Sequence, residues 1–290
     1  MLNRPFFSAA STSATAGSPR VIILVVRLML PVDPADLHST FITFVLAIAR
    51  IAGMMLVVPI LGRRVMTGVA RNGVIIGLAF PVIVLAWATK PRDLDMMGLT
   101  PLLGLGLKEL LLGVVLGLPV AAIMWGIEAA GTFIDNQRGA MMTSLLDPAS
   151  GNQASPLGTF LGDLYAIWLF VTGGFSKLLE ALYRSHEIWP VWSFHPRIGP
   201  AFVAEVLGLA DVVMRLTLLL AGPAIVAMLL SELGLALIGR FAPQLQVFYL
   251  AMPVKSIVGL LLLILSLTVV LSHADNHVLS PIAFVSRIAE

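Results

Sequence analysis

Long apolar runs alternate with short polar stretches along most of the chain. A helix needs about 20 residues to cross a bilayer, and the runs that predict such helices cover about residues 40–61, 74–89, 102–133, 157–179, 203–238 and 247–271. The 203–238 run is too long for one straight span and contains Gly222 and Pro223, so we expect two helices or one broken helix. The pattern predicts an all-α polytopic membrane protein.

The composition agrees with this pattern. Hydrophobic residues make up 58% of the 290 residues and charged residues only 12%, whereas soluble domains have roughly 25% charged residues. The mean hydropathy is +0.97. The formal net charge of +2 is small and spread along the chain, so we expect no nucleic-acid partner. The chain has no cysteine, which excludes disulfides, thiolate chemistry and cysteine-bearing metal sites.

The N-terminal residues differ from the rest. Residues 1–20 are rich in Ser, Ala and Thr, and the apolar stretch 21–30 is short and interrupted by Arg27. We expect residues 1–28 to be a disordered leader or a mis-assigned start, with translation beginning at Met29. A signal peptide is the third interpretation, disfavoured by the charge in its apolar core and the lack of a small-residue cleavage site. Residues 29–290 are expected to form a single membrane domain.

One polar segment stands between two apolar runs. Residues 131–158 read GTFIDNQRGAMMTSLLDPASGNQASPLG, in which acids, amides and an arginine are mixed with glycine and proline. An irregular backbone of this kind cannot face lipid, because its N–H and C=O groups would lack partners. The segment must therefore lie in water, against protein, or along a water-filled path. In a membrane protein this predicts a pore or a gate.

Charged residues also occur inside the apolar runs. They are Arg50, Lys108, Glu109, Glu128, Asp163, Asp211, Arg215, Glu232 and Lys255. Each costs about 2.5 to 3.5 kcal/mol at a bilayer centre, so the helices that carry them are expected to face other protein. Asp211 and Arg215 are spaced i,i+4 and are predicted to form a structural ion pair. A proton or ion relay is the alternative interpretation, which the scatter of the charges over several helices disfavours.

Residues suited to catalysis or metal binding do not form a recognisable pattern. His273 and His277 are spaced i,i+4, as in helical metal sites, but no third ligand lies near them in the sequence. A phosphate-binding loop and a nucleophile motif are both missing. Gly113 and Gly117 form a GxxxG pattern, which is more typical of helix packing than of catalysis. We therefore expect no enzyme activity, no cofactor and no metal.

Two motifs resemble a known family. The segment IDNQRGAMMTSLLDPASGNQASPLG resembles the signature of the SctT family, the T component of the type III secretion export apparatus, and is similar to that of flagellar FliR proteins. The second motif is APQLQVF at 242–248, followed by MPVKSIVGLLLL at 252–263. The matching positions are Asp135, Asn136, Gln137, Arg138, Pro156, Pro243, Gln244, Pro253 and Lys255. The resemblance runs from about residue 30 to 271.

The resemblance implies a role in protein export. SctT-like proteins have broken and hairpin helices and join SctR-like and SctS-like subunits in a helical export gate in the bacterial inner membrane, through which unfolded secreted proteins pass. SctU-like and SctV-like export apparatus proteins are further implied partners, beside membrane lipid. About residues 29–156 would form an SctR-like part, and 157–272 would contain the SctS-like part. Residues 273–290 would be a tail.

The resemblance also gives the polar segment a role. In such gates a loop of the T protein projects into the pore as a plug. The matching positions that would shape or seal it here are Gly139, Met141, Met142, Leu145, Leu146, Asp147, Pro148 and Gly151. Methionine and leucine side chains supply flexible apolar surface that can seal around a passing chain. The alternative is a loop that only packs between subunits.

Two other functions are also consistent with the sequence. The first is a flagellar FliR-type gate subunit, although the wording of the DNQRG motif resembles the secretion branch more closely. The second is an ion-coupled secondary transporter with a site at Lys108, Glu109, Asp163 or Lys255. Transporters often have broken helices around a midplane site, but the break at Gly222 and Pro223 has no matching partner in the other half of the chain.

Overall fold

The computed structural model describes residues 34–61, 67–91, 94, 97–140, 155–196, 198–241, 247–278 and 281–289. Within these ranges the chain is helical and contains no strand. The helices are α2 (Pro34–Val57), the short 3-10 helix η2 (Pro59–Leu61), α3 (Gly68–Ala88), α4 (Leu99–Arg138), α6 (Pro156–Val171), α7 (Gly174–Ile188), α8 (Phe202–Phe241), α9 (Val247–Val278) and α10 (Pro281–Ala289). The predicted all-α class is confirmed.

Among the residues that the structure describes, five helices are long and apolar enough to cross a membrane: α2, α3, α4, α8 and α9. The 157–179 run does not form one straight helix, because α6 and α7 meet at an angle of 72°. Gly173 lies at the bend with φ +75°, a left-handed conformation that glycine adopts readily. The chain is therefore a multi-pass membrane protein, and its described helices supply five candidate spans, or six if α6 and α7 together count as one.

Two expectations about helix breaks were wrong. The 203–238 run forms one continuous helix, α8, with Pro223 inside it. A proline removes one helical hydrogen bond, and here packing against α4 and α9 holds the helix together on both sides of it. Residues 134–138, which follow the predicted 102–133 helix, were expected to have an irregular backbone, yet they form the end of α4. The polar segment is therefore shorter than its composition suggested.

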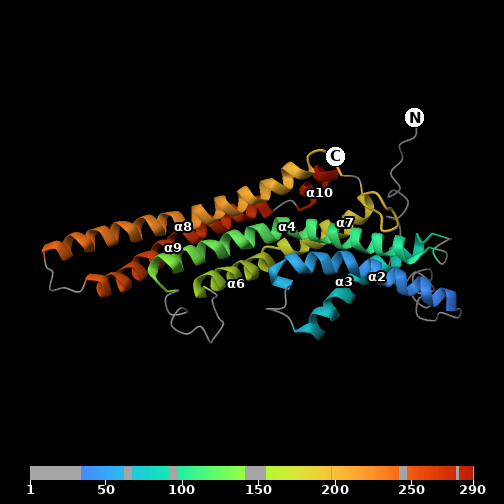
Figure 1. Cartoon of the computed structure of the whole chain (residues 1–290), viewed down its shortest axis with the longest axis horizontal. Helices are drawn as coiled ribbons and strands as arrows, with labels where there is room; N and C mark the ends of the chain where they lie inside the picture. The colour runs from blue at the N-terminus through green and yellow to red at the C-terminus, as the bar shows by residue number, and fades with distance from the viewer. Residues whose placement is uncertain are drawn as a thin grey trace.

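Helix α4 is the central element of the bundle, and it contacts α2, α6, α8 and α9 (Figure 1). Its glycines allow these close approaches. A Cβ atom at Gly113 would overlap the backbone oxygen of Arg50, and one at Gly117 would lie 3.1 Å from the backbone oxygen of Met54. The predicted GxxxG packing face is therefore confirmed, and its partner is α2.

Helices α8 and α9 run side by side along the long axis of the molecule (Figure 1). Gly259 of α9 packs closely on the sulfur of Met228 of α8. Elsewhere this pair leaves much apolar surface uncovered, and only 11% of the apolar stretch Tyr249–Leu267 is buried within the chain. The hairpin therefore needs lipid or other protein around it.

Candidate functional site

The carboxylate of Asp135 lies near the end of α4, in the first part of the polar segment. It is fully buried. Its Oδ1 atom accepts a hydrogen bond from Arg138 Nε at 2.8 Å and lies 2.6 Å from a second nitrogen of the same guanidinium. The helix then ends at Gly139, which has φ +80° and caps the helix in the left-handed conformation. This carboxylate therefore fixes the last turn of α4.

The other oxygen of the same carboxylate holds the start of α6. The Ser155 hydroxyl donates to Asp135 Oδ2 at 2.5 Å, and the backbone N–H of Leu157 donates to that oxygen at 2.9 Å. Ser155 is also the N-cap of α6, since its hydroxyl accepts a hydrogen bond from the N–H of Gly158. Pro156 occupies the first turn of α6, where the missing N–H costs nothing. One buried group thus holds both ends of the segment between α4 and α6.

Close packing at two glycines supports this link between α4 and α6. A Cβ atom at Gly131 of α4 would lie 2.6 Å from the Cα of Gly158 of α6, too close for two carbon atoms. A Cβ atom at Gly158 would in turn lie 2.8 Å from the backbone oxygen of Glu128. The two helices can therefore approach only because both positions are glycine, and their approach brings Ser155 within reach of Asp135.

A second buried polar site joins three parts of the bundle. Arg50 of α2 donates to both oxygens of Glu109 of α4, at 2.7 and 3.0 Å, and both side chains are fully buried. Arg50 also donates to the hydroxyl of Ser185 of α7 and to the backbone oxygen of Trp189, each at 2.8 Å. Bidentate arginine–carboxylate pairs of this kind have well-defined geometry.

Lys108 extends this cluster to the turn after α7. Its ammonium lies 2.7 Å from Glu109 and donates to the backbone oxygens of Pro190, Val191 and Ser193 at 2.8 to 3.0 Å. Because an ammonium has only three hydrogens, these acceptors saturate it. The arrangement suits a structural junction of α2, α4 and α7, since its charged groups are already occupied by protein partners.

The sequence identified the charges of this cluster but not their pairing. Arg50 and Glu109 are 59 positions apart, and no pattern in one sequence indicates which buried charges meet. Ser185 and Trp189 were not predicted to take part at all. The only signal was the cost of leaving such charges unpaired in an apolar run.

Other predicted residues are placed differently. Lys255 of α9 pairs with Glu232 of α8 at 2.6 Å, so two of the charges in apolar runs join the α8–α9 hairpin. Asp211 and Arg215 both lie exposed on α8, and within the described residues no ion pair joins them. Their predicted pairing stays a prediction. Asp163 is also exposed.

The remaining motif residues divide into described and undescribed positions. Asn136 and Pro253 are exposed, and Gln137 is partly exposed. Nine predicted positions lie outside the described residues, namely Met141, Met142, Leu145, Leu146, Asp147, Pro148, Gly151, Pro243 and Gln244. Among the described residues no group of three His, Cys, Asp or Glu side chains could hold a metal ion.

Comparison with known proteins decides the family. Residues 41–280 match the family described as bacterial export proteins, family 1. The chain belongs to this family. Within bacterial export proteins, family 1, it is 37% identical over 262 residues to the Yop proteins translocation protein T of Yersinia pestis, covering 88% of this chain and 99% of that protein.

Other family members show how wide the similarity is. The surface presentation of antigens protein SpaR of Salmonella typhimurium is 32% identical over 237 residues, covering 81% of this chain and 87% of that protein. The flagellar biosynthetic protein FliR of Bacillus subtilis is 28% identical over 239 residues, covering 81% and 90%. The resemblance predicted from the two motifs is therefore confirmed, and the secondary-transporter interpretation is not favoured.

Proposed function

We propose that this chain is an inner-membrane subunit of a type III protein secretion export gate, forming part of the pore through which unfolded proteins are exported. The observation that carries the proposal is the family match, which extends over residues 41–280. The multi-pass helical fold supports it. Identity of 37% to a Yop translocation protein, against 28% to a flagellar FliR protein, favours the secretion branch over the flagellar one. The role is not enzymatic.

The proposed partners are SctR-like and SctS-like gate subunits, with SctU-like and SctV-like proteins as further neighbours. The surface of the chain supports this assignment. Large side chains along α8 and α9 are more than half exposed, among them Leu218, Leu230, Leu233, Leu237, Ile257, Leu261, Ile264 and Leu265. Contiguous apolar surface marks contact with protein or membrane. In this proposal the α8–α9 hairpin belongs to the SctS-like part, residues 157–272, and α2 to α4 belong to the SctR-like part, residues 29–156.

The polar segment is proposed to act as the pore plug. The residues on either side of its undescribed part support this role. Asp135 at the end of α4 binds Ser155 and Leu157 at the start of α6, which holds the two helix ends together. A segment held in this way can project from the bundle without separating α4 from α6. Met141, Met142, Leu145 and Leu146 are the side chains proposed to seal the pore.

Copurification tests the proposed function. The chain would be expressed alone and together with SctR-like and SctS-like subunits, extracted in mild detergent, and compared by size-exclusion chromatography and mass. We expect one complex that contains all three proteins, and poor recovery of the chain expressed alone. A stable, monodisperse monomer that binds neither partner would contradict the gate assignment.

A further inference from the structure

Helices α6 and α7 are joined to α4 at both ends of the pair. At one end, Asp135 of α4 accepts a hydrogen bond from the hydroxyl of Ser155, the N-cap of α6. At the other end, Lys108 of α4 donates to three backbone oxygens in the turn that follows α7. Arg50 of α2 reinforces that end, since it donates to the hydroxyl of Ser185 near the end of α7. We call the first place the near anchor (Asp135 with Ser155) and the second the far anchor (Lys108 and Arg50 with Ser185 and the turn after α7).

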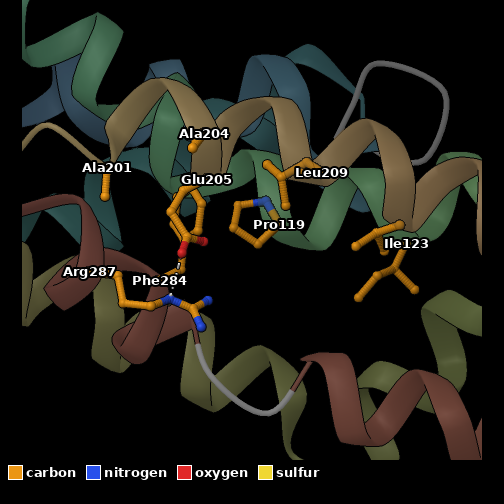
Figure 2. A pocket seen from close by; sticks show the side chains of 10 residues that line it. Pro119, Ile123, Ala201, Ala204, Glu205, Leu209, Phe284 and Arg287 are labelled. Carbon is orange, nitrogen blue, oxygen red and sulfur yellow. Dashed lines mark ion pairs between the residues drawn. The ribbon is translucent and has the colours of Figure 1, made fainter.

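Helix α10 holds the turn after α7 in place. It contacts α7 as well as α4 and α8. The backbone oxygen of Ile288 in α10 accepts a hydrogen bond of 2.9 Å from the N–H of Gly199, just before α8. Figure 2 shows the neighbouring contact, in which Arg287 of α10 reaches Glu205 of α8, with Nε 3.2 Å from Oε1. The far anchor is therefore fixed by α2, α4 and α10 together.

The distance between the two anchors suits a bent pair of helices. Lys108 and Asp135 stand 27 positions apart on α4, which corresponds to about 40 Å at 1.5 Å per residue. The 16 residues of α6 and the 15 residues of α7 form legs of about 24 and 22 Å. At the observed bend of 72° these legs reach about 37 Å, whereas in a straight line they would reach about 46 Å. The bent pair therefore matches the distance between the anchors, and a straight pair would be too long.

The bend between α6 and α7 is closely packed. The rings of Phe170 and Phe175, one on each side of the bend, have their centroids 4.8 Å apart, a separation typical of aromatic pairs. A Cβ atom at Gly174 would lie only 2.5 Å from Cδ1 of Leu169, so α7 begins in close contact with the end of α6. Gly173 supplies the left-handed conformation of the turn. Because packed groups transmit strain, a pair that is packed at its bend and held at both ends responds as one body.

We propose that α6 and α7 together form a rigid positioning arm, through which the far anchor sets where α6 begins and hence where the chain returns from the polar segment. The inference rests on the proposed function, in which that segment is the pore plug. Lys108 is then a positioning residue for the plug, although it stands about 40 Å from the near anchor along α4. Substitutions more than about 7 to 10 Å apart usually act independently. Coupling between the two anchors is therefore the property that distinguishes the arm from two separate structural contacts.

Hydrogen exchange of the copurified complex tests the arm. The N–H groups of Leu157 and Gly158 donate to side chains of the near anchor, so their exchange rates report its opening. Lys108→Met removes the ammonium of the far anchor and is expected to raise these rates by about 2- to 30-fold, the range of coupling through packed networks. Arg184→Met is the matched control, because it removes a cation from α7 itself whose pair with Glu180 is about half exposed; it should leave these rates unchanged. An increase confined to the far anchor would overturn the proposal.

A second variant distinguishes the arm from α4 as the route of the coupling. Two glycines inserted after Gly173 make the bend flexible and leave both anchors intact. In this background, Lys108→Met is expected to add nothing to the exchange rates of Leu157 and Gly158. The same increase with and without the insertion would place the route in α4 and overturn the proposal. If the insertion alone fully exposes the start of α6, Phe175→Ala takes its place, since it weakens the packing of the bend at constant chain length.

The exchange rates in α8 and α9 show whether a variant unfolds the whole chain. If Lys108→Met does so, Ser185→Ala replaces it, because this change removes only one acceptor of Arg50 at the far anchor. The same coupling and the same loss of coupling on insertion are then expected. The proposed function is judged separately, at purification. If the parent chain binds neither SctR-like nor SctS-like subunits, the gate assignment fails, whereas a parent complex in which the two anchors exchange independently contradicts only the arm.

Discussion

The hydroxyl of Ser155 donates a hydrogen bond of 2.5 Å to the carboxylate of Asp135, 20 positions earlier in the chain. The same carboxylate binds Arg138 in the last turn of α4 and the N–H of Leu157 in the first turn of α6. A single buried carboxylate thereby links the end of α4 to the start of α6.

Replacement of Asp135 by alanine is expected to weaken the link between the end of α4 and the start of α6. The change leaves Arg138 without its buried partner, and breaking such a pair costs about 3 to 5 kcal/mol; the exposure of Arg138 places the effect at the lower end. Limited proteolysis of the copurified complex should show faster cleavage between residues 139 and 155. Asn136→Ala, on the exposed side of the same turn, is the matched control and should leave cleavage unchanged. Equal cleavage in both variants would contradict this role.

Glu109→Ala is expected to destabilise the bundle strongly. It removes the carboxylate that Arg50 and Lys108 share and leaves buried charge unpaired, at about 3 to 5 kcal/mol. Complex yield and thermal stability in detergent are the measurements. Glu180→Ala is the control, because the Glu180–Arg184 pair is about half exposed and such pairs contribute about 0 to 1 kcal/mol. A Glu109→Ala complex that assembles normally yet no longer exports protein would instead support a relay.

Gly113→Val should prevent α2 from packing on α4. Even a Cβ atom at this position would overlap backbone atoms of Arg50, and these cannot move aside as the end of a flexible side chain could. Overpacking typically costs about 1 to 3 kcal/mol, and backbone overlap places this variant at or above the upper end. Gly222→Ala in α8 is the control, since nothing lies within 4 Å of its added methyl group. Comparable complex yields for the two variants would contradict the close packing of α2 on α4.

Alanine at Met141, Met142, Leu145 and Leu146 is expected to make the closed gate leak ions and small solutes. Hydrophobic constrictions seal by dewetting, and smaller side chains widen the constriction and favour water inside it. Conductance or small-solute sensitivity of cells that carry the assembled complex is the measurement. A control with alanine at Phe80 and Leu85, both exposed on α3, removes apolar volume elsewhere. Intact assembly with unchanged permeability would reduce this segment to a packing loop.

Asp211→Ala is expected to change the isolated chain by no more than about 0.5 kcal/mol, because surface substitutions rarely do more. If Asp211 and Arg215 pair against a partner subunit, the same variant should lower complex yield. Replacing both residues by apolar ones should then recover part of the yield. Normal yield from the single variant would exclude a structural role for the pair in assembly.

The sequence alone determined the class of protein and its family. Long apolar runs with few charges leave a membrane as the only suitable solvent, and backbone satisfaction in lipid then requires helices. The DNQRG and APQ motifs carried the family resemblance because they are local strings of residues that need no knowledge of contacts. The GxxxG pattern indicated a packing face for the same reason: its spacing on one helix is a local property.

Tertiary structure decided everything that depends on two distant positions. The pairing of Arg50 with Glu109, the bond between Asp135 and Ser155, and the seating of α10 against α4 and α8 each join segments that are far apart in sequence. Packing also overrode the helix-breaking tendency of Pro223. Helix α8 stays continuous through this residue, where it packs against α4 and α9. Hydropathy indicates whether a residue lies in water or in an apolar environment. Which residue it contacts depends on how neighbouring helices pack, and this packing is determined by the whole chain.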